Sequence, residues 1–213
     1  IGRNRQHLYL LYASEHGIYE IPYFNIDDLN FYPFECNETQ LEICDASFPQ
    51  EKPLSLFIPQ NPKFEYKASD LRTLTSKRYP NVQVQIQVNE NLIDFYNTYP
   101  ASEVNGNFMT KWAMYANTPL DENVKENLYP SLKDKINGLG QLEAVNKLLN
   151  WVQTAFVYEY DDKVWGHDRA FFAEETLYYP YCDCEDRAIL FTRLVRDLLG
   201  LKTILVFYPG HLA

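Results

Sequence analysis

The hydrophobic pattern changes its period part-way along the chain, and this change constrains the fold more than any other feature. Residues 82–88 alternate apolar and polar side chains, which is the pattern of a half-buried β-strand. From Leu120 onward, apolar residues instead recur at the spacing of an α-helix. The sequence therefore predicts an α+β protein with a β-rich accessory domain, residues 1–117, followed by an α+β domain, residues 118–213.

Short apolar runs in the first part are separated by clusters of Pro, Asn and Asp, which interrupt regular structure. These runs predict strands over residues 8–12, 18–21, 54–58 and 82–88, arranged as an antiparallel sheet or sandwich. The sequence shows no internal repeat and no low-complexity tract.

Helices are predicted at the start of the second part. Residues 121–136 have helical spacing, although Pro130 inside the segment weakens the prediction. Residues 141–156 carry a longer apolar stripe that begins at Leu142 and is predicted to face the core.

A further helix and a strand are predicted near the end of the chain. Residues 186–199 are amphipathic, and Gly200 follows them at the position where helices commonly end. Residues 203–208 are rich in β-forming side chains and predict a fully buried strand. Pro209 and Gly210 then predict a turn.

The acidic composition limits the classes of partner. The chain has 29 acidic and 19 basic residues, a formal net charge of −10. Nucleic-acid binding relies on Lys and Arg at the phosphates, so we expect no nucleic acid and no anionic membrane as partner. No apolar run reaches the roughly 20 residues that span a bilayer. The sequence carries no clear sign of oligomeric state.

The four cysteines are too few for a disulfide scaffold. Cys36 and Cys44 can pair in an exported protein or remain two free thiols. Cys184 takes the first position of a predicted helix, because Asp183 suits the N-cap and Asp186 the first turn. The helix dipole there favours a thiolate. Nearby carboxylates oppose it, so a reactive thiol needs them to point away or to pair, for example with Arg187.

A histidine follows the last predicted strand, and that strand can carry the imidazole back to the thiol. Cys184 is therefore the candidate nucleophile and His211 its candidate base. The alternatives are a core cysteine and a surface histidine. Cys182 offers a second, less favoured thiol.

The pattern of Cys184, Asp186 and Ala188, followed by an apolar helix, a buried strand and His211, resembles the transglutaminase-like, or papain-like, cysteine enzymes. The enzyme-like match covers roughly residues 120–213. The whole chain looks like Bacteroides-type transglutaminase-like proteins with a β-rich region ahead of this domain.

The resemblance implies acyl transfer at an amide through a thioester on Cys184, with a protein or peptide substrate and no cofactor. Water as acceptor gives a peptidase or amidase, which we favour, and a lysine amine gives a transglutaminase. The family's acidic triad member lies beyond its histidine, so we expect the domain to be truncated here and the natural chain to continue past Ala213. An extracytoplasmic location, in the periplasm or on the surface of a Gram-negative bacterium, is implied. The alternative is a catalytically inactive scaffold that binds a protein or a glycan.

The polar, aromatic connection between residues 161 and 181 precedes the candidate nucleophile. Trp165 and Tyr181 are candidate substrate-binding residues, although both side chains can equally serve packing. A zinc site is a weaker alternative, because a Cys-x-Cys opening a helix lacks the usual second ligand pair; the side chains weighed for it are Cys182, Cys184, His167 and His211. We therefore predict no metal ligands.

Overall fold

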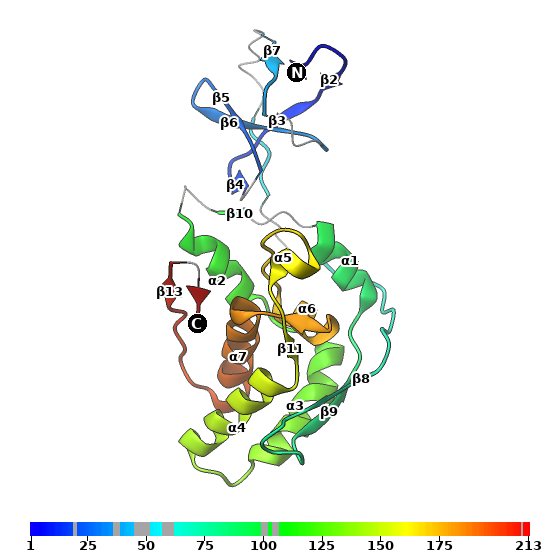
Figure 1. The fold of residues 1–213 in the computed structure, drawn as a ribbon, viewed down its shortest axis with the longest axis vertical. Helices are drawn as coiled ribbons and strands as arrows, with labels where there is room; N and C mark the ends of the chain where they lie inside the picture. The colour runs from blue at the N-terminus through cyan, green and yellow to red at the C-terminus, as the bar shows by residue number, and fades with distance from the viewer. Residues whose placement is uncertain are drawn as a thin grey trace. The chain divides into compact units, whose positions relative to one another are not determined.

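The computed structural model of the chain describes residues 1–18, 21–35, 39–44, 52–56, 62–98, 102–103, 107–209 and 211–213. These residues form helices and small sheets, which confirms the α+β class. The chain divides into two compact units, drawn in Figure 1: residues 1–63 with 100–112, and residues 64–99 with 113–213. This division differs from the predicted boundary at 117/118, because residues 64–99 pack with the second unit.

The first unit consists of short antiparallel strands. Tyr32, only 1% exposed, accepts a hydrogen bond of 3.0 Å from the Ile18 backbone N–H and anchors its core. The strands are β1 (Gly2–Arg3), β2 (Leu8–Tyr9), β3 (Leu11–Ala13), β4 (Gly17–Ile18), β5 (Phe24–Ile26), β6 (Leu29–Pro33), β7 (Glu42–Ile43) and β10 (Ser102–Glu103). Their sheet orders are β2-β1-β7, β3-β6-β5 and β10-β4.

The strands predicted for this part are found in part. Residues 8–12 form β2 and most of β3. Leu54 makes an isolated bridge with Ser14. Residues 19–20 and 57–58, which belong to two predicted strands, lie outside the described residues. Cys36 also lies outside them, so its pairing with Cys44 is not described.

The clearest predicted strand is confirmed in the second unit. β9 (Gln83–Ile86) pairs antiparallel with β8 (Arg72–Thr75), and its side chains alternate between exposed Gln and buried Val84 and Ile86. Helix α3 packs on the buried face of β9. The alternation of apolar and polar residues therefore predicted both the strand and the face that it buries.

Two short helices precede the predicted helical part. They are α1 (Glu90–Thr98) and α2 (Met109–Asn117), of nine residues each. Nine residues make only two and a half turns, so the apolar spacing repeats too few times to stand out in the sequence. The prediction of a β-rich first part did not include these two helices.

The next two helices agree with the predicted ones. α3 (Glu122–Ile136) tolerates Pro130 and buries Leu128 and Leu132 completely. α4 (Gln141–Thr154) buries Leu148 and Trp151, but Leu142 is 74% exposed. The predicted stripe is therefore confirmed at Leu148 and Val152, while Leu142 lies outside the buried face and Trp151 belongs to it.

Three further helices complete the second unit: α5 (Asp161–Val164), α6 (Ala173–Tyr178) and α7 (Cys184–Leu199). α7 packs against α4, α6 and β14 (His211–Leu212), and Figure 1 shows it among them. Gly200 ends α7 with φ +66°, a left-handed conformation that suits glycine, as the sequence predicted. No helix among the described residues has the length and apolar character needed to cross a membrane.

The strand predicted over residues 203–208 is largely absent. Only β13 (Phe207–Tyr208) forms, in a hairpin with β14. Ile204 is 84% exposed and Tyr208 is 54% exposed. An apolar run becomes a buried strand only when neighbouring strands cover it, and among the described residues β13 pairs with β14 alone.

Candidate active site

The chain around Cys184 folds into a buried helix start. Asp183 is the N-cap residue and Cys184 is the first residue of α7, as predicted. Asp186 is completely buried, and its carboxylate accepts the backbone N–H of Asp183 at 3.2 Å and that of Phe171 at 2.8 Å. Asp186 therefore fixes the helix start against the segment that leads into α6.

The thiol of Cys184 is half-buried among polar partners. Its Sγ donates a hydrogen bond of 2.9 Å to Oε2 of Glu185. Burial, followed by the hydrogen bond and the charge of Glu185, raises the pKa of the Cys184 thiol to about 12. The expectation that the helix dipole favours a thiolate is thus overturned locally, because burial and a neighbouring carboxylate outweigh it.

Arg187 does not pair with the carboxylates. Its Nε donates to Sγ of Cys182 at 3.4 Å, and its Nη2 donates to the Phe156 carbonyl at 3.2 Å. Cys182 is only 2% exposed, and burial raises the pKa of its thiol to about 11. Cys182 is therefore inaccessible, whereas Cys184 is reachable.

His211 lies on the strand that packs against α7. In β14, Leu212 is buried while the His211 side chain is exposed and lies beside the ring of Tyr208, with centroids 6.5 Å apart. The packing of β14 on α7 brings this strand to the helix that Cys184 begins. Within the described residues, no hydrogen bond joins the imidazole of His211 to the thiol of Cys184. His211 and Cys184 therefore lie on elements that pack together, but their side chains are not hydrogen-bonded to each other among the described residues.

Five carboxylates form overlapping groups, two of whose members, Asp183 and Glu185, lie next to the thiol. Oxygens of Asp161, Asp183 and Asp186 lie within 4.8 Å of one another, as do those of Asp161, Asp168 and Glu185. Burial, assisted by neighbouring negative charges, raises the pKa of Asp161 to about 6 and that of Asp183 to about 8. Asp183 is only 8% exposed, and its Oδ1 has no hydrogen-bond partner in the part of the chain that the structure describes.

This oxygen-rich group has the chemistry of a hard-cation site, since Ca²⁺ prefers several carboxylate oxygens. Cys184 can join Asp183 and Glu185 in a third such group. The zinc alternative finds no support among the described residues, because His167 and His211 belong to none of these groups. His167 instead places a ring nitrogen 3.1 Å from the Trp165 carbonyl oxygen.

The two candidate substrate-binding residues have different surroundings. Trp165 packs edge-on against Phe171 and Tyr179, at 5.9 and 4.9 Å between ring centroids, beneath the guanidinium of Arg169 at 4.4 Å. Its observed contacts are those of a packing residue. Tyr181, in β12 (Tyr181–Cys182), is 40% exposed and free to meet a ligand.

Tyr158 was not predicted as a site residue. It lies in β11 (Val157–Tyr158), which pairs in parallel with β12, two residues before Cys184. Burial raises the pKa of its phenol, and the Cys184 thiol lies close enough to the hydroxyl to raise that pKa further. This strand pairing joins segments more than twenty residues apart, so no local sequence signal could reveal it.

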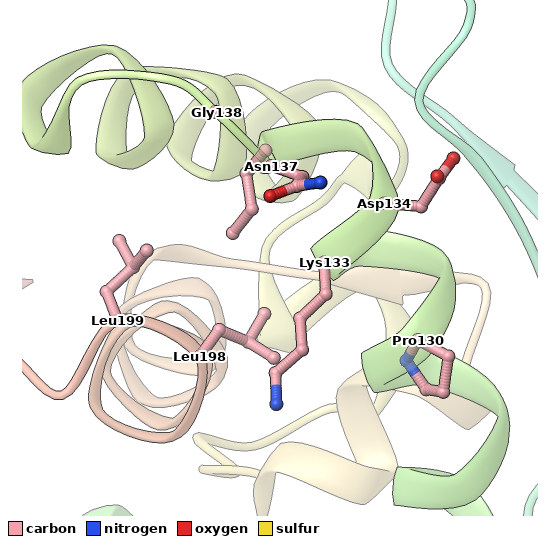
Figure 2. A pocket seen from close by; sticks show the side chains of 8 residues that line it. Pro130, Lys133, Asp134, Asn137, Gly138, Leu198 and Leu199 are labelled. Atoms are coloured by element: carbon pink, nitrogen blue, oxygen red, sulfur yellow. The ribbon is translucent and has the colours of Figure 1, made fainter.

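A separate pocket lies far from this site. Figure 2 shows its lining at the ends of α3 and α7, including Lys133, Asn137, Leu198 and Leu199. With a rise of about 1.5 Å per residue, the length of α7 separates Leu198 from Cys184 by roughly 20 Å. The pocket therefore does not belong to the thiol site.

No protein-family model, curated protein or solved structure matches the chain. What the site can do must therefore be argued from its own residues.

Proposed function

We propose that the protein is a cysteine acyl hydrolase of the transglutaminase-like kind, acting on an amide of a protein or peptide. One observation carries the proposal. Strand β14, which holds His211, packs against α7, the helix that Cys184 begins. An accessible thiol at a helix start, with an exposed imidazole on the adjacent strand, is a recurrent arrangement in acyl transfer.

The reaction follows from these two side chains. Cys184 passes its proton to His211 while Sγ bonds to the substrate carbonyl carbon, and the carbonyl π electrons move to oxygen. The oxyanion collapses, the C–N bond breaks, and the proton on His211 goes to the leaving amine. Water then attacks the thioester carbon and gives a proton to His211. The C–S bond breaks, the proton on His211 returns to the sulfur, and the products are a carboxylic acid and the restored thiol.

The hydrogen bond between Cys184 and Glu185 favours a different class of function. It holds the thiol protonated, which is the state expected of a scaffold that keeps the fold without the chemistry. That scaffold would bind a protein or a glycan. Only a reactivity measurement separates the two functions.

The deciding experiment is acylation by a p-nitrophenyl ester, followed by intact-protein mass spectrometry and peptide mapping. The hydrolase predicts one acyl group on Cys184, lost in Cys184→Ala and slowed in His211→Ala. Cys44→Ser is the matched control, because Cys44 is an exposed thiol in the other unit. A wild-type protein that is never acylated at Cys184 would instead support the scaffold.

A further inference from the structure

Tyr158 is held in place by backbone pairing on one side. Its strand runs parallel to β12, with Tyr158 opposite Cys182, and the Glu159 N–H donates to the Cys182 carbonyl at 3.3 Å. Because Cys184 follows Cys182 by two residues, this register brings the Tyr158 side chain beside the start of α7.

Arg187 holds the ring of Tyr158 from the other side. Its guanidinium carbon lies 4.8 Å from the ring centroid, in cation–π geometry. Arg187 follows Cys184 by three residues on α7, and residues at this spacing share a helix face. The ring that Arg187 covers therefore lies along the face that presents the thiol.

The polar end of Tyr158 reaches the reacting atom. Burial raises the pKa of the phenol, and the Cys184 thiol is close enough to the Tyr158 hydroxyl to raise that pKa further. Strand β14 packs against the same helix, α7. Hydrogen-bond donors gathered at a nucleophile are close to the place where the carbonyl oxygen gains charge during attack.

Building on the proposed hydrolase, we propose that Tyr158 is a catalytic residue. Its hydroxyl donates a hydrogen bond to the oxyanion that forms on the carbonyl oxygen when Cys184 attacks, and Arg187 is its positioning residue. Tyr158 keeps its own proton throughout, and His211 alone carries the proton in transfer. Burial, with the nearby charges of Cys184 and Asp183, raises the pKa of Tyr158 to about 12. The phenol is therefore protonated at neutral pH and remains a donor.

The test is the rate of acylation of Cys184 in Tyr158→Phe, measured by stopped-flow release of p-nitrophenol. Phe keeps the ring for Arg187 and removes only the hydroxyl. The matched control is Tyr160→Phe, because Tyr160 is a neighbour at 5.6 Å between centroids and is 59% exposed. Loss of one oxyanion donor typically slows the step by about 100-fold.

We expect the maximal acylation rate to fall by that factor in Tyr158→Phe, with the half-saturating ester concentration unchanged, because the hydrogen bond forms only in the transition state. Tyr160→Phe should match the wild type. If both variants instead showed a lower maximal rate together with a higher half-saturating ester concentration, the assignment would be wrong. Wild-type acylation in Tyr158→Phe overturns this proposal alone, whereas a wild-type protein without acylation at Cys184 overturns this proposal and the hydrolase together.

Discussion

The thiol of Cys184 donates a 2.9 Å hydrogen bond to the carboxylate of its own neighbour, Glu185. Both groups lie at the first turn of α7, where the helix dipole would otherwise favour a thiolate. Burial and this carboxylate together hold the thiol protonated. Burial is the larger cause, and Glu185 is the neighbouring side chain that adds most to it.

Replacing Glu185 with Gln should increase the reactivity of Cys184. The amide keeps the shape of the side chain and removes the charge, and each unit by which the thiol pKa falls raises the thiolate fraction about tenfold. The measurement is iodoacetamide labelling at a fixed pH of 7.5, with the exposed Cys44 as internal reference. Glu159→Gln serves as the control, because Glu159 pairs with Lys163 instead. An unchanged ratio of Cys184 to Cys44 labelling would show that Glu185 does not restrain the thiol.

The sequence predicted the elements with long or regular patterns and missed those defined by distant contacts. The alternation in β9 and the apolar stripe of α3 are visible locally. The place of Trp151 in the buried face of α4 was missed, because its partner, the Leu74 carbonyl at 3.3 Å, lies on a hairpin far away in the sequence. The buried strand predicted over residues 203–208 is largely absent for a related reason. The composition of a segment does not reveal which strands, if any, will pair with it.

The sequence predicted which residues form the candidate site better than it predicted the electrostatics of those residues. The N-cap at Asp183 placed Cys184 at the helix start, because capping is a local property. The raised thiol pKa depends on burial, which only the packed structure supplies. Tyr158 was missed because it reaches Cys184 through the parallel pairing of β11 with β12.

A divalent cation should stabilise the protein through the carboxylates around Cys184. A ligand that binds only the native state stabilises it by about 2.7 kcal/mol at a concentration 100 times its Kd. We therefore expect CaCl₂ to raise the Tm, and EDTA to reverse the rise. Asp161→Asn should weaken the response, since Asp161 shares two of the oxygen groups. Asp134→Asn is the control, because that side chain is 72% exposed and pairs with Lys135. Equal Ca²⁺ responses in both variants would place cation binding elsewhere.

Glu174 should make stability depend on pH. Its Oε2 accepts the Asp121 N–H at 2.9 Å at the start of α3, while its buried Oε1 has no partner. Burial raises the pKa of Glu174 from 4.5 to about 7. The folded state then binds more protons than the unfolded state between these values, so stability falls as pH rises from about 4.5 to 7.

Glu174→Gln isolates this contribution. The amide oxygen can still accept the Asp121 N–H, and the variant cannot ionise. At pH 8 the variant should be more stable than the wild type by up to about 3 kcal/mol, and this gain should vanish near pH 4.5. Urea unfolding at several pH values measures the difference. If the stability gain of the variant were the same at every pH, it would come from packing rather than from the ionisation of Glu174. Glu126→Gln, a surface change, should show no pH-dependent difference.

Arg169 should be a large single contributor to the stability of the segment that leads into α7. Its guanidinium pairs at 2.8 Å with Glu175, whose side chain is 3% exposed, and its backbone N–H donates to Asp161 at 2.6 Å. Removing one partner of a buried pair typically costs about 3–5 kcal/mol, because the other charge is left without compensation. Arg169→Ala should therefore unfold at clearly lower urea concentration.

The control for Arg169 is a pair with the same charges in an exposed setting. Lys163 bonds to Glu159 at 2.8 Å, with 65% of the Lys163 side chain exposed, and Lys163→Ala should cost less than about 1 kcal/mol. Trp165 emission provides a second readout, since Arg169 lies 4.4 Å over its ring. Arg169→Ala should change that emission and Lys163→Ala should not. If both variants lost the same free energy of unfolding, Glu175 would have found another partner in Arg169→Ala. Burial would then not determine how much this ion pair contributes to stability.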